Sequence, residues 1–421
     1  MDRILHSSRT LQLFFTTIIF LLASPVSGQI EGCTDPYALN YNSNASWNDG
    51  SCIYEETFFI PMQHLELPEA LEETSGLIFW ADGIWTFNDS GGDPKIYKVD
   101  TIDGIIIQEI TISNGNNVDW EDIAQDEDHI YVGDFGNNSG TRKDLVIYRI
   151  AKADIPSTGN ADVSAEVISY SYADQEDFTP KPDNNEYDCE AMICVEGNIY
   201  LFTKNWVSET SRLYSMSSEP GNYSILPLDT LNTTGLVTGA AFSDELGQII
   251  LSGYRNYMPL LFLLFDYHEY SFFSGNKRLI QMPGIFGAQT EGVCFSEGYN
   301  AFLSCEKSLF NQKLFTFSTA TWTDTTMVYL QENHMKLEVA VHPNPVDEGP
   351  LTIDIYNPKK DSYQVKIYDS SGKVVLSREY KATVGNNKHT FTVSIPEITA
   401  GMYLLHIFSE DMYANEMLII R

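Results

Sequence analysis

Basic side chains are scarce in this 421-residue chain, in which 25 Lys and Arg stand against 58 Asp and Glu and the formal net charge is −33. Residues 1–28 contribute +1 and residues 339–421 contribute −2, so residues 29–338 hold −32 of that charge. A surface this negative repels phosphate backbones and attracts cations, which argues against nucleic-acid binding. Two interpretations stay open: the acidity keeps an exported protein soluble, or it binds cations.

Several catalytic and metal-binding signatures are missing. None of the six cysteines forms a Cys-x-x-Cys pair and no histidine cluster accompanies them, which argues against a zinc site. The chain has no Gly-x-Ser-x-Gly elbow and no phosphate-cradling glycine-rich loop between a strand and a helix. Only His64, His129 and His268 lie in the middle of the chain, none at a repeated position, so a Ser-His-Asp triad is disfavoured as well.

Long apolar runs are also missing after the first 28 residues. Arg3 and Arg9 precede an apolar run from Leu11 to Ala23, which ends in small residues up to Gly28. This pattern predicts a secretory signal peptide over residues 1–28. No later segment reaches the roughly 18 apolar residues of a membrane-spanning helix. We therefore expect an exported mature chain without a transmembrane segment.

Helical periodicity is almost absent from residues 58–332, where short apolar runs alternate with clusters of Gly, Asn, Asp and Ser. The runs fall into five groups of four, and a related phrase opens each group. The equivalent positions in that phrase are taken as Ser75, Glu121, Glu190, Gly239 and Glu291, separated by 46, 69, 49 and 52 residues. Four-stranded units at this spacing predict an all-β fold built on a β-propeller. Stacked sandwiches would not explain the recurring phrase.

The sequence also bears on the number of blades, on two of the outer strands and on one insert. The run Phe58–Leu67 either closes the ring by pairing with the last blade or belongs to a sixth blade, so five or six blades are expected. The fourth strands of the third and fifth groups are expected at Tyr223–Leu228 and Thr325–Leu330. An Asp-, Pro- and Asn-rich insert, Asp174–Tyr187, predicts a surface loop.

The loops that enter the inner strands of a propeller crowd one mouth of its central channel. The acids expected near one axis are Asp119, Glu121, Asp122, Asp188, Glu190 and Glu291. The loops that follow the second strands are expected at the opposite mouth or turned across it; they are Asn88–Gly92, Asp134 with Asn137 and Asn138, Lys204–Asn205, Arg255–Asn256 and Glu306–Lys307.

Convergent carboxylates raise one another's pKa, so they either share protons or bind a hard cation, and oxygen ligands favour Ca²⁺. The residues predicted to bind a metal or ligand are Asp119, Glu121, Asp122, Asp134, Glu190 and Glu291. In the alternative, each acid accepts hydrogen bonds from amides of the neighbouring blade, a role that suits Asp122 and Asp188. Ser75 and Gly239 replace an acid in two of the five copies, and this lopsided ring favours a binding site.

Residues 29–57 form a short, turn-rich segment bracketed by Cys33 and Cys52, for which we predict a disulfide. A second disulfide between Cys294 and Cys305, across a predicted hairpin, is left open, and Cys189 and Cys194 fit equally as small buried hydrophobes. The matching residues Gly32–Asp35, Asn40–Asn42, Ala45 and Asp49–Cys52 make the segment similar to a small Cys-pair module of Bacteroidetes surface proteins. Its oxygens suit calcium, and a stapled spacer is the alternative.

Residues 333–421 change character, with about seven short predicted strands that indicate a small β-sandwich. Four groups of residues in this segment form recognisable motifs: Pro343-Asn344-Pro345, Lys366–Asp369 with Gly372–Val375, Gly401-Met402-Tyr403 and Met417–Arg421. They resemble the type A C-terminal sorting domain of the Bacteroidetes type IX (Por) secretion system. The resemblance implies passage across the outer membrane by the type IX machinery, removal of the tail, and release or attachment to the cell surface.

The middle of the chain, over roughly residues 70–320, also resembles a family. Trp85–Gly91, Asp119–Ala124, Gly133–Asn138 and Ile147–Arg149 are similar to exported bacterial propellers that are distantly phytase-like or lactonase-like. The sequence favours a secreted or cell-surface propeller that binds a glycan, a protein or a small molecule at an acidic mouth. The alternative is a calcium-dependent phosphoesterase or lactonase. A phosphate site should carry several basic residues, and only Lys204, Arg255 and Lys307 stand at comparable loop positions.

Overall fold

The computed structural model describes residues 29–308, 310–324, 335–346, 349–356, 362–368, 374–382, 387–395, 399–409 and 412–421. The predicted signal peptide and the run Thr325–Leu330 lie outside these residues. No helix within the described ranges is long and apolar enough to cross a membrane.

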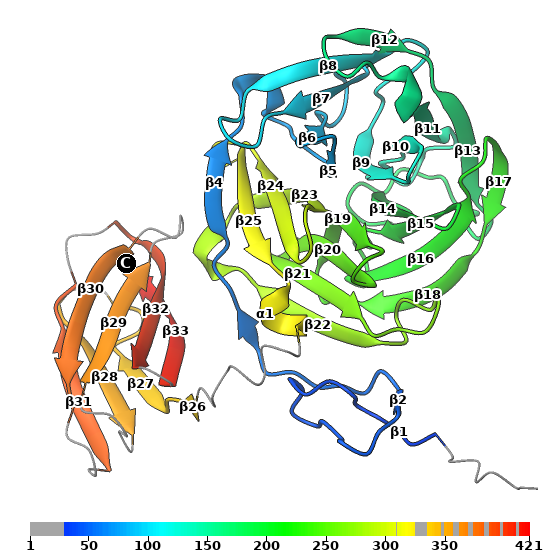
Figure 1. Cartoon of the computed structure of the whole chain (residues 1–421). Helices are drawn as coiled ribbons and strands as arrows, with labels where there is room; N and C mark the ends of the chain where they lie inside the picture. Colours follow the sequence, from blue (N-terminus) through cyan, green and yellow to red (C-terminus); the bar gives the residue numbers. More distant parts are fainter. Residues whose placement is uncertain are drawn as a thin grey trace, which may run out of the picture.

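Five sheets of at least four strands radiate from a common channel, and Figure 1 looks along this channel onto the five blades. In blades one to four the chain runs outward from the inner strand in antiparallel steps, as the alternating runs predict. Blade one contains β5 (Ile78–Trp80), β6 (Gly83–Thr86), β7 (Lys95–Val99) and β8 (Ile106–Ile112); blade two contains β9 (Trp120–Gln125), β10 (His129–Asp134), β11 (Leu145–Ala151) and β13 (Glu166–Tyr172). Blade three contains β14 (Cys189–Val195), β15 (Asn198–Thr203), β16 (Thr210–Ser217) and β18 (Pro227–Asn232). Blade four contains β19 (Leu236–Ser243), β20 (Gln248–Arg255), β21 (Met258–Phe265) and β22 (Asn276–Gln281).

The fifth blade combines both ends of the propeller segment. Its strands are β23 (Gln289–Phe295), β24 (Asn300–Glu306), β25 (Lys313–Ser318) and β4 (Met62–Glu66), and β4 lies antiparallel to β25. The N-terminal run therefore closes the ring, which confirms one of the two alternatives and leaves five blades rather than six. The place expected for Thr325–Leu330 beside β25 is occupied by β4.

Three blades carry an additional outer strand that runs parallel to the fourth. These strands are β12 (Ala161–Val163) on β8, β17 (Gly221–Ile225) on β13 and β3 (Thr57–Phe58) on β22. The predicted single strand Tyr223–Leu228 is therefore wrong, because its first half joins blade two and its second half opens β18 of blade three. The division falls at Pro227, whose ring nitrogen cannot donate to a ladder and so suits the first residue of a strand.

The hydrophobic core lies between the blades. Every residue of the inner strand β14 is buried, since it faces a blade on each side. Between blades one and two, the ring of the fully buried Trp120 meets the ring of Phe87 edge to face, with centroids 5.4 Å apart. Helical structure is limited in the described chain to η1 (Glu69–Leu71), η2 (Lys152–Asp154), η3 (Pro283–Ile285) and α1 (Ala320–Thr323).

The N-terminal module packs against blade four. The predicted disulfide between Cys33 and Cys52 is present, beside the short parallel pair β1 (Glu31–Gly32) and β2 (Trp47–Asn48). The Trp47 ring stacks on His268 with centroids 3.7 Å apart, and the Asn48 amide donates to the Asp266 carbonyl at 2.9 Å. The other four cysteines are buried and free, so the possible Cys294–Cys305 bridge is not formed.

The C-terminal domain is a small β-sandwich, as the sequence predicts. One sheet has the order β26 (Met335–Lys336), β33 (Met412–Ile420), β32 (Gly401–Ser409), β29 (Ser362–Tyr368) and β30 (Val374–Lys381); the other has β27 (Val339–His342), β28 (Leu351–Tyr356) and β31 (Lys388–Val393). Alternating residues such as Ile353 and Val365 form its buried core.

The motif around Asn344 connects the start of this domain to its C-terminal strand. Asn344, which lies between Pro343 and Pro345, donates through its side-chain amide to the Met417 carbonyl at 2.6 Å and accepts the Ile419 N–H at 2.9 Å. Gly401 opens β32, and the hydroxyl of Tyr403 donates to the Thr399 carbonyl at 2.8 Å. Gly372 lies outside the described residues.

Candidate functional site

A β-bulge near the start of the inner strand in blades two to five accounts for the repeated phrase. In blade two, Trp120 pairs with Asp134 and Asp122 pairs with Gly133, which leaves Glu121 as the extra residue. Glu190 takes the same position in blade three, and Glu291 with Gly292 stands opposite a single residue in blade five. A bulge bends its strand and re-aims the extra side chain. This is why three glutamates recur in register.

The predicted equivalence in blade four is wrong by one residue. Val237 pairs with Gly253 and Gly239 pairs with Ser252, so Thr238 is the bulged residue there. A Cβ on Gly239 would collide with the Glu291 carbonyl oxygen of the next blade, so close packing requires glycine. The Thr238 hydroxyl donates to the Thr290 carbonyl at 2.7 Å, and the Ser75 hydroxyl likewise donates to the Glu121 carbonyl. These two non-acidic copies thus link blades, and the lopsided ring has a structural cause.

The glutamates open into a cavity of about 340 Å³ at one mouth of the channel. Its lining residues are Ser75, Asp89, Glu121, Asn138, Asp183, Glu190, Lys204, Trp206, Tyr254, Gln289, Glu291 and Glu306. Loops that follow the second strands line the same mouth as the inner-strand entries, so the opposite-mouth alternative is wrong. The reason is that antiparallel neighbours place the end of one strand beside the start of the other.

The mouth holds carboxyl groups whose pKa values are raised. Burial, and then the charge of Asp119, raises the pKa of Asp89 to about 7, and burial raises that of Asp119 to about 6. Glu306 also has a pKa of about 7, again chiefly through burial. Burial and the neighbouring Glu190 charge raise the pKa of Glu121 well above its ordinary value. The expected crowding of acids is therefore present.

One ammonium group partly balances these acids. Lys204 Nζ lies 2.7 Å from both carboxylate oxygens of Glu190, and both residues are buried. The ammonium also lies over the rings of Trp206 and Tyr254, at 4.7 Å and 5.6 Å from their centroids. Burial opposes the charge of Lys204, but the Glu190 carboxylate raises the Lys204 pKa. Lys204 and Glu190 therefore form a buried ion pair in the wall of the mouth.

The remaining predicted acids accept hydrogen bonds that connect neighbouring blades. Asp122 accepts the amide N–H groups of Met192 at 2.7 Å and Ala240 at 3.2 Å, from blades three and four. Asp188 accepts the Asn137 amide at 2.7 Å and the Trp206 indole N–H at 2.7 Å. This confirms the blade-linking alternative for Asp122 and Asp188.

Asp134 is likewise engaged. It forms an ion pair with Arg142 at 2.8 Å and accepts the Asp119 amide N–H at 3.1 Å. The structure therefore brings Asp119 and Glu121 together with Asp89, sets Glu190 and Glu291 in the same mouth, and holds Asp122 and Asp134 in other contacts.

The insert Asp174–Tyr187 lies outside the blades, as predicted, and also reaches the mouth. The Lys181 amide donates to the Ser139 carbonyl at 2.9 Å, and the Asp183 amide donates to the Asn138 carbonyl at 3.0 Å. Asp183 has a positive φ of 51° and lines the cavity. Sequence reasoning missed Asp183, and the only signal for it was an Asp-rich insert next to a bulged strand.

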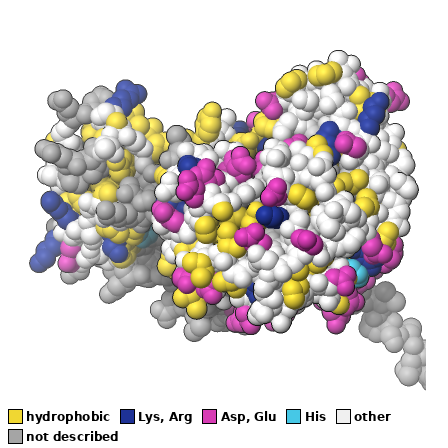
Figure 2. Space-filling model, turned by 90° about the horizontal axis from the view of Figure 1, so that it is seen from above, with side chains coloured by type: hydrophobic (Ala, Val, Ile, Leu, Met, Phe, Trp, Pro, Cys, Tyr) yellow, Lys and Arg dark blue, Asp and Glu magenta, His cyan; other side chains and the backbone are white. Residues whose placement is uncertain are grey.

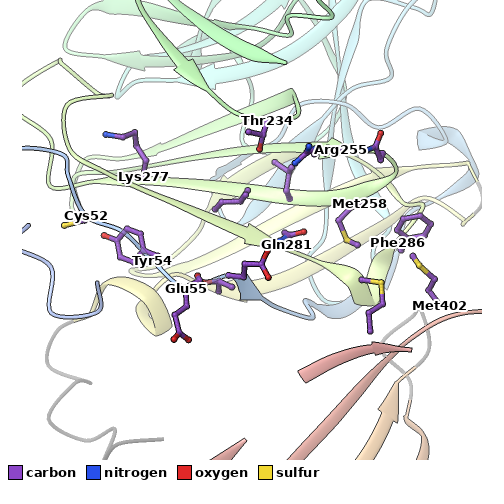
Figure 3. A pocket seen from close by; sticks show the side chains of 16 residues that line it. Cys52, Tyr54, Glu55, Thr234, Arg255, Met258, Lys277, Gln281, Phe286 and Met402 are labelled. Carbon is purple, nitrogen blue, oxygen red and sulfur yellow. The ribbon is translucent and has the colours of Figure 1, made fainter. Parts of the chain in front are cut away.

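A larger cavity of about 630 Å³ lies away from the mouth, between blade four, the N-terminal module and the sorting domain. Figure 3 shows Met258 and Phe286 close to Met402 of the sorting domain, with Lys277 and Tyr54 toward the other end. Lys277 Nζ donates to the carbonyls of Phe273 and Gly275, at 2.9 and 2.7 Å. Residues from all three parts line this cavity, so it is a seam between parts of the chain.

On the face that Figure 2 shows, the surface charge does not mark a second site. Figure 2 looks onto the rim of the propeller and shows acidic side chains spread over the visible face rather than gathered in one patch. Many basic groups are paired with acids, including Arg149 with Glu166 at 3.0 Å and with Glu219 at 3.2 Å. Among the described residues, the mouth is where buried carboxyls meet.

Fold and site together define a class: a five-bladed β-propeller with a carboxylate-rich channel mouth. Residues 340–421 match the family described as "Secretion system C-terminal sorting domain". The protein is therefore exported by the type IX secretion system to the cell surface or the extracellular space. A comparison with curated proteins found no match.

Several solved structures are similar to this chain at a low level. A periplasmic gluconolactonase of Pseudomonas aeruginosa is 15% identical over 76% of this chain and 88% of its own, with a TM-score of 0.29. A quinoprotein alcohol dehydrogenase-like protein of Bacteroides thetaiotaomicron is 11% identical over 79% and 70%, also with a TM-score of 0.29. A Bombyx mori β-fructofuranosidase mutant in complex with sucrose is 9% identical over 86% and 88%, with a TM-score of 0.38. Likeness at this level carries no argument about activity.

Proposed function

We propose that this exported propeller is a binding protein that takes a positively charged ligand in the acidic mouth of its channel. The observation that carries the proposal is Glu121, which is buried in the mouth with only 6% of its surface exposed. Its neighbours Glu190, Asp89 and Asp119 are all acidic and raise its pKa. A buried carboxylate in such surroundings is stable only when it is protonated or meets a cation.

The basic residues near this mouth are already occupied. Lys204 is paired with Glu190, and Arg142 is paired with Asp134. Farther from the mouth, Lys307 forms an ion pair with Glu72, and Arg255, which lines the larger cavity, lies 4.0 Å from Glu209. Lys204, Arg255 and Lys307, already too few for a phosphate site, therefore also have acidic partners. This supports a cationic ligand over an anionic one.

Calorimetry with hexaamminecobalt(III) tests the proposal. This inert trivalent cation is attracted by charge and does not exchange its ammonia ligands for carboxylates. We expect it to bind the full chain at pH 7.5, and the variant Glu121→Gln to bind it several-fold more weakly. Asp162→Ala, which removes an exposed acid on the rim strand β12, is the matched control and should bind as the wild type does. Equal binding by all three proteins would contradict the proposal.

A calcium-dependent hydrolase is the second candidate, and one observation favours it. Glu306 lines the mouth and has a pKa of about 7, which suits general acid–base catalysis at neutral pH. If this candidate is right, hydrolysis of a phosphoester or lactone should depend on Ca²⁺ and change steeply near pH 7. Glu306→Gln should remove that change. No turnover across both substrate classes would exclude it.

A further inference from the structure

We propose that Asp89, Asp119 and Glu121 form a binding site for one divalent cation, and that this cation is Ca²⁺. The inference rests on the proposed function, because the site lies in the same acidic mouth. It goes further by naming the ion and its ligands. Asp89 follows the second strand of blade one, whereas Asp119 and Glu121 belong to the entry of β9 in blade two.

The three groups are close enough to hold one cation together. One carboxylate oxygen from each residue lies within 4.8 Å of the others. Oxygens on opposite sides of Ca²⁺ lie up to about 5.2 Å apart, because each Ca–O distance is about 2.3–2.6 Å. Mg²⁺ is usually held by one or two carboxylates and keeps several waters, so three carboxylates favour Ca²⁺. The three oxygens therefore lie within reach of one Ca²⁺.

A glycine provides the space in which two of the ligands converge. A Cβ on Gly136 would collide with Oε1 of Glu121 and with Oδ2 of Asp119, so both oxygens lie over the bare Cα of this residue. Gly136 is held there because its amide donates to the Asp119 carbonyl at 3.1 Å. Because Gly136 is not among the residues with positive φ, this close approach, and not the backbone conformation, explains the glycine.

The third ligand carries an oxygen without a partner. Oδ1 of Asp89 is buried and accepts no hydrogen bond from the residues that the structure describes. Its loop is fixed against blade two, since the Asn117 side-chain amide donates to the carbonyls of Asp89 at 2.5 Å and Asn88 at 3.0 Å. A buried acceptor left unpaired costs free energy, and a cation would remove that cost.

Three carboxylates do not complete the coordination of this ion. Ca²⁺ takes about 6–8 oxygen ligands, so water or oxygen atoms of a further ligand must supply the rest from the cavity. The cavity of about 340 Å³ that adjoins Glu121 has room for them. The same geometry thus points to a ligand with hydroxyl or carboxylate oxygens that binds through the ion.

Titration calorimetry of the full chain with CaCl₂ and with MgCl₂ tests the site. We expect Ca²⁺ to bind more tightly than Mg²⁺, with one ion per chain at this mouth. Outer-shell substitutions typically weaken metal binding by about 10–100-fold, so loss of a direct ligand in Asp89→Asn should cost at least about tenfold. The control Glu306→Gln removes an acid of the same mouth outside the three ligands and should change affinity far less.

Gly136→Ala separates coordination from charge. The added methyl group occupies the place of the two oxygens while every charge is kept, so we expect Ca²⁺ binding to be lost and hexaamminecobalt(III) binding to remain. Circular dichroism and the melting temperature establish that each variant is folded, and Asp89→Asn carries the test if Gly136→Ala is not. Equal loss of Ca²⁺ in Asp89→Asn and Glu306→Gln would overturn the site. Binding of hexaamminecobalt(III) without Ca²⁺ would overturn it and leave the proposed function standing, and binding of neither would overturn both.

Discussion

Asp122→Ala is expected to destabilise the folded protein by about 3 kcal/mol or more. The Asp122 carboxylate is fully buried and accepts the N–H groups of Ile123, Met192 and Ala240, which belong to three different blades. Each buried donor left without an acceptor costs about 1–3 kcal/mol, and alanine would leave three. Urea denaturation measures the loss as a fall in the midpoint of unfolding.

The conservative variant and a control refine this test. Asp122→Asn keeps one acceptor oxygen, so it should lie between the alanine variant and the wild type. Asp162→Ala removes an exposed acid and should stay within about 0.5 kcal/mol of the wild type. If Asp122→Ala unfolded at the wild-type midpoint, the blades would not depend on this carboxylate for their register.

Lys204→Met is expected to have the second large effect. It leaves the buried Glu190 carboxylate without the ammonium that now lies 2.7 Å away, and breaking a buried pair on one side typically costs about 3–5 kcal/mol. The double variant Lys204→Met/Glu190→Gln removes both charges and should recover most of the loss. A double-mutant cycle of the unfolding free energies measures the coupling.

The loss should also depend on pH in a defined direction. Burial already raises the Glu190 pKa and Lys204 opposes this rise, so removing Lys204 raises the folded-state pKa further. A carboxyl with a raised folded-state pKa weakens the fold as pH rises above its unfolded value, because the unfolded chain releases the proton more readily. Lys204→Met should therefore lie closer to the wild type at pH 5 than at pH 8. A constant difference across this range would contradict the assignment.

Much of the fold was accessible from local patterns. Alternating runs such as Leu145–Ile150 predicted strands because one face of a blade packs on its neighbour. The strand pattern and motifs of the C-terminal segment predicted a β-sandwich and the export route. Cys33 and Cys52, which bracket a turn-rich segment, predicted the disulfide. The closing strand Met62–Glu66 was one of two alternatives, since strand pairing between distant segments leaves no local trace.

The candidate site was accessible only in part. Glu121, Glu190 and Glu291 could be recognised because a repeated phrase carries them. Thr238 was missed because a bulge shifts the register by one residue, and its signal is a backbone pairing rather than a residue type. Asp89 was placed in a loop with two possible positions, and the position follows from the antiparallel order of β5 and β6.

The sequence by itself determined that this is a β-propeller with an acidic middle and a C-terminal sorting domain, because period, composition and terminal motifs are local properties of the chain. Only the tertiary structure decided which acids link neighbouring blades through hydrogen bonds and which come together in the channel mouth. Asp122 and Asp119 are both aspartates of the same segment. Asp122 accepts amide hydrogen bonds from neighbouring blades, whereas Asp119 lies over Gly136 beside Glu121. That difference arises from how separate blades close around one axis, which sequence spacing does not encode.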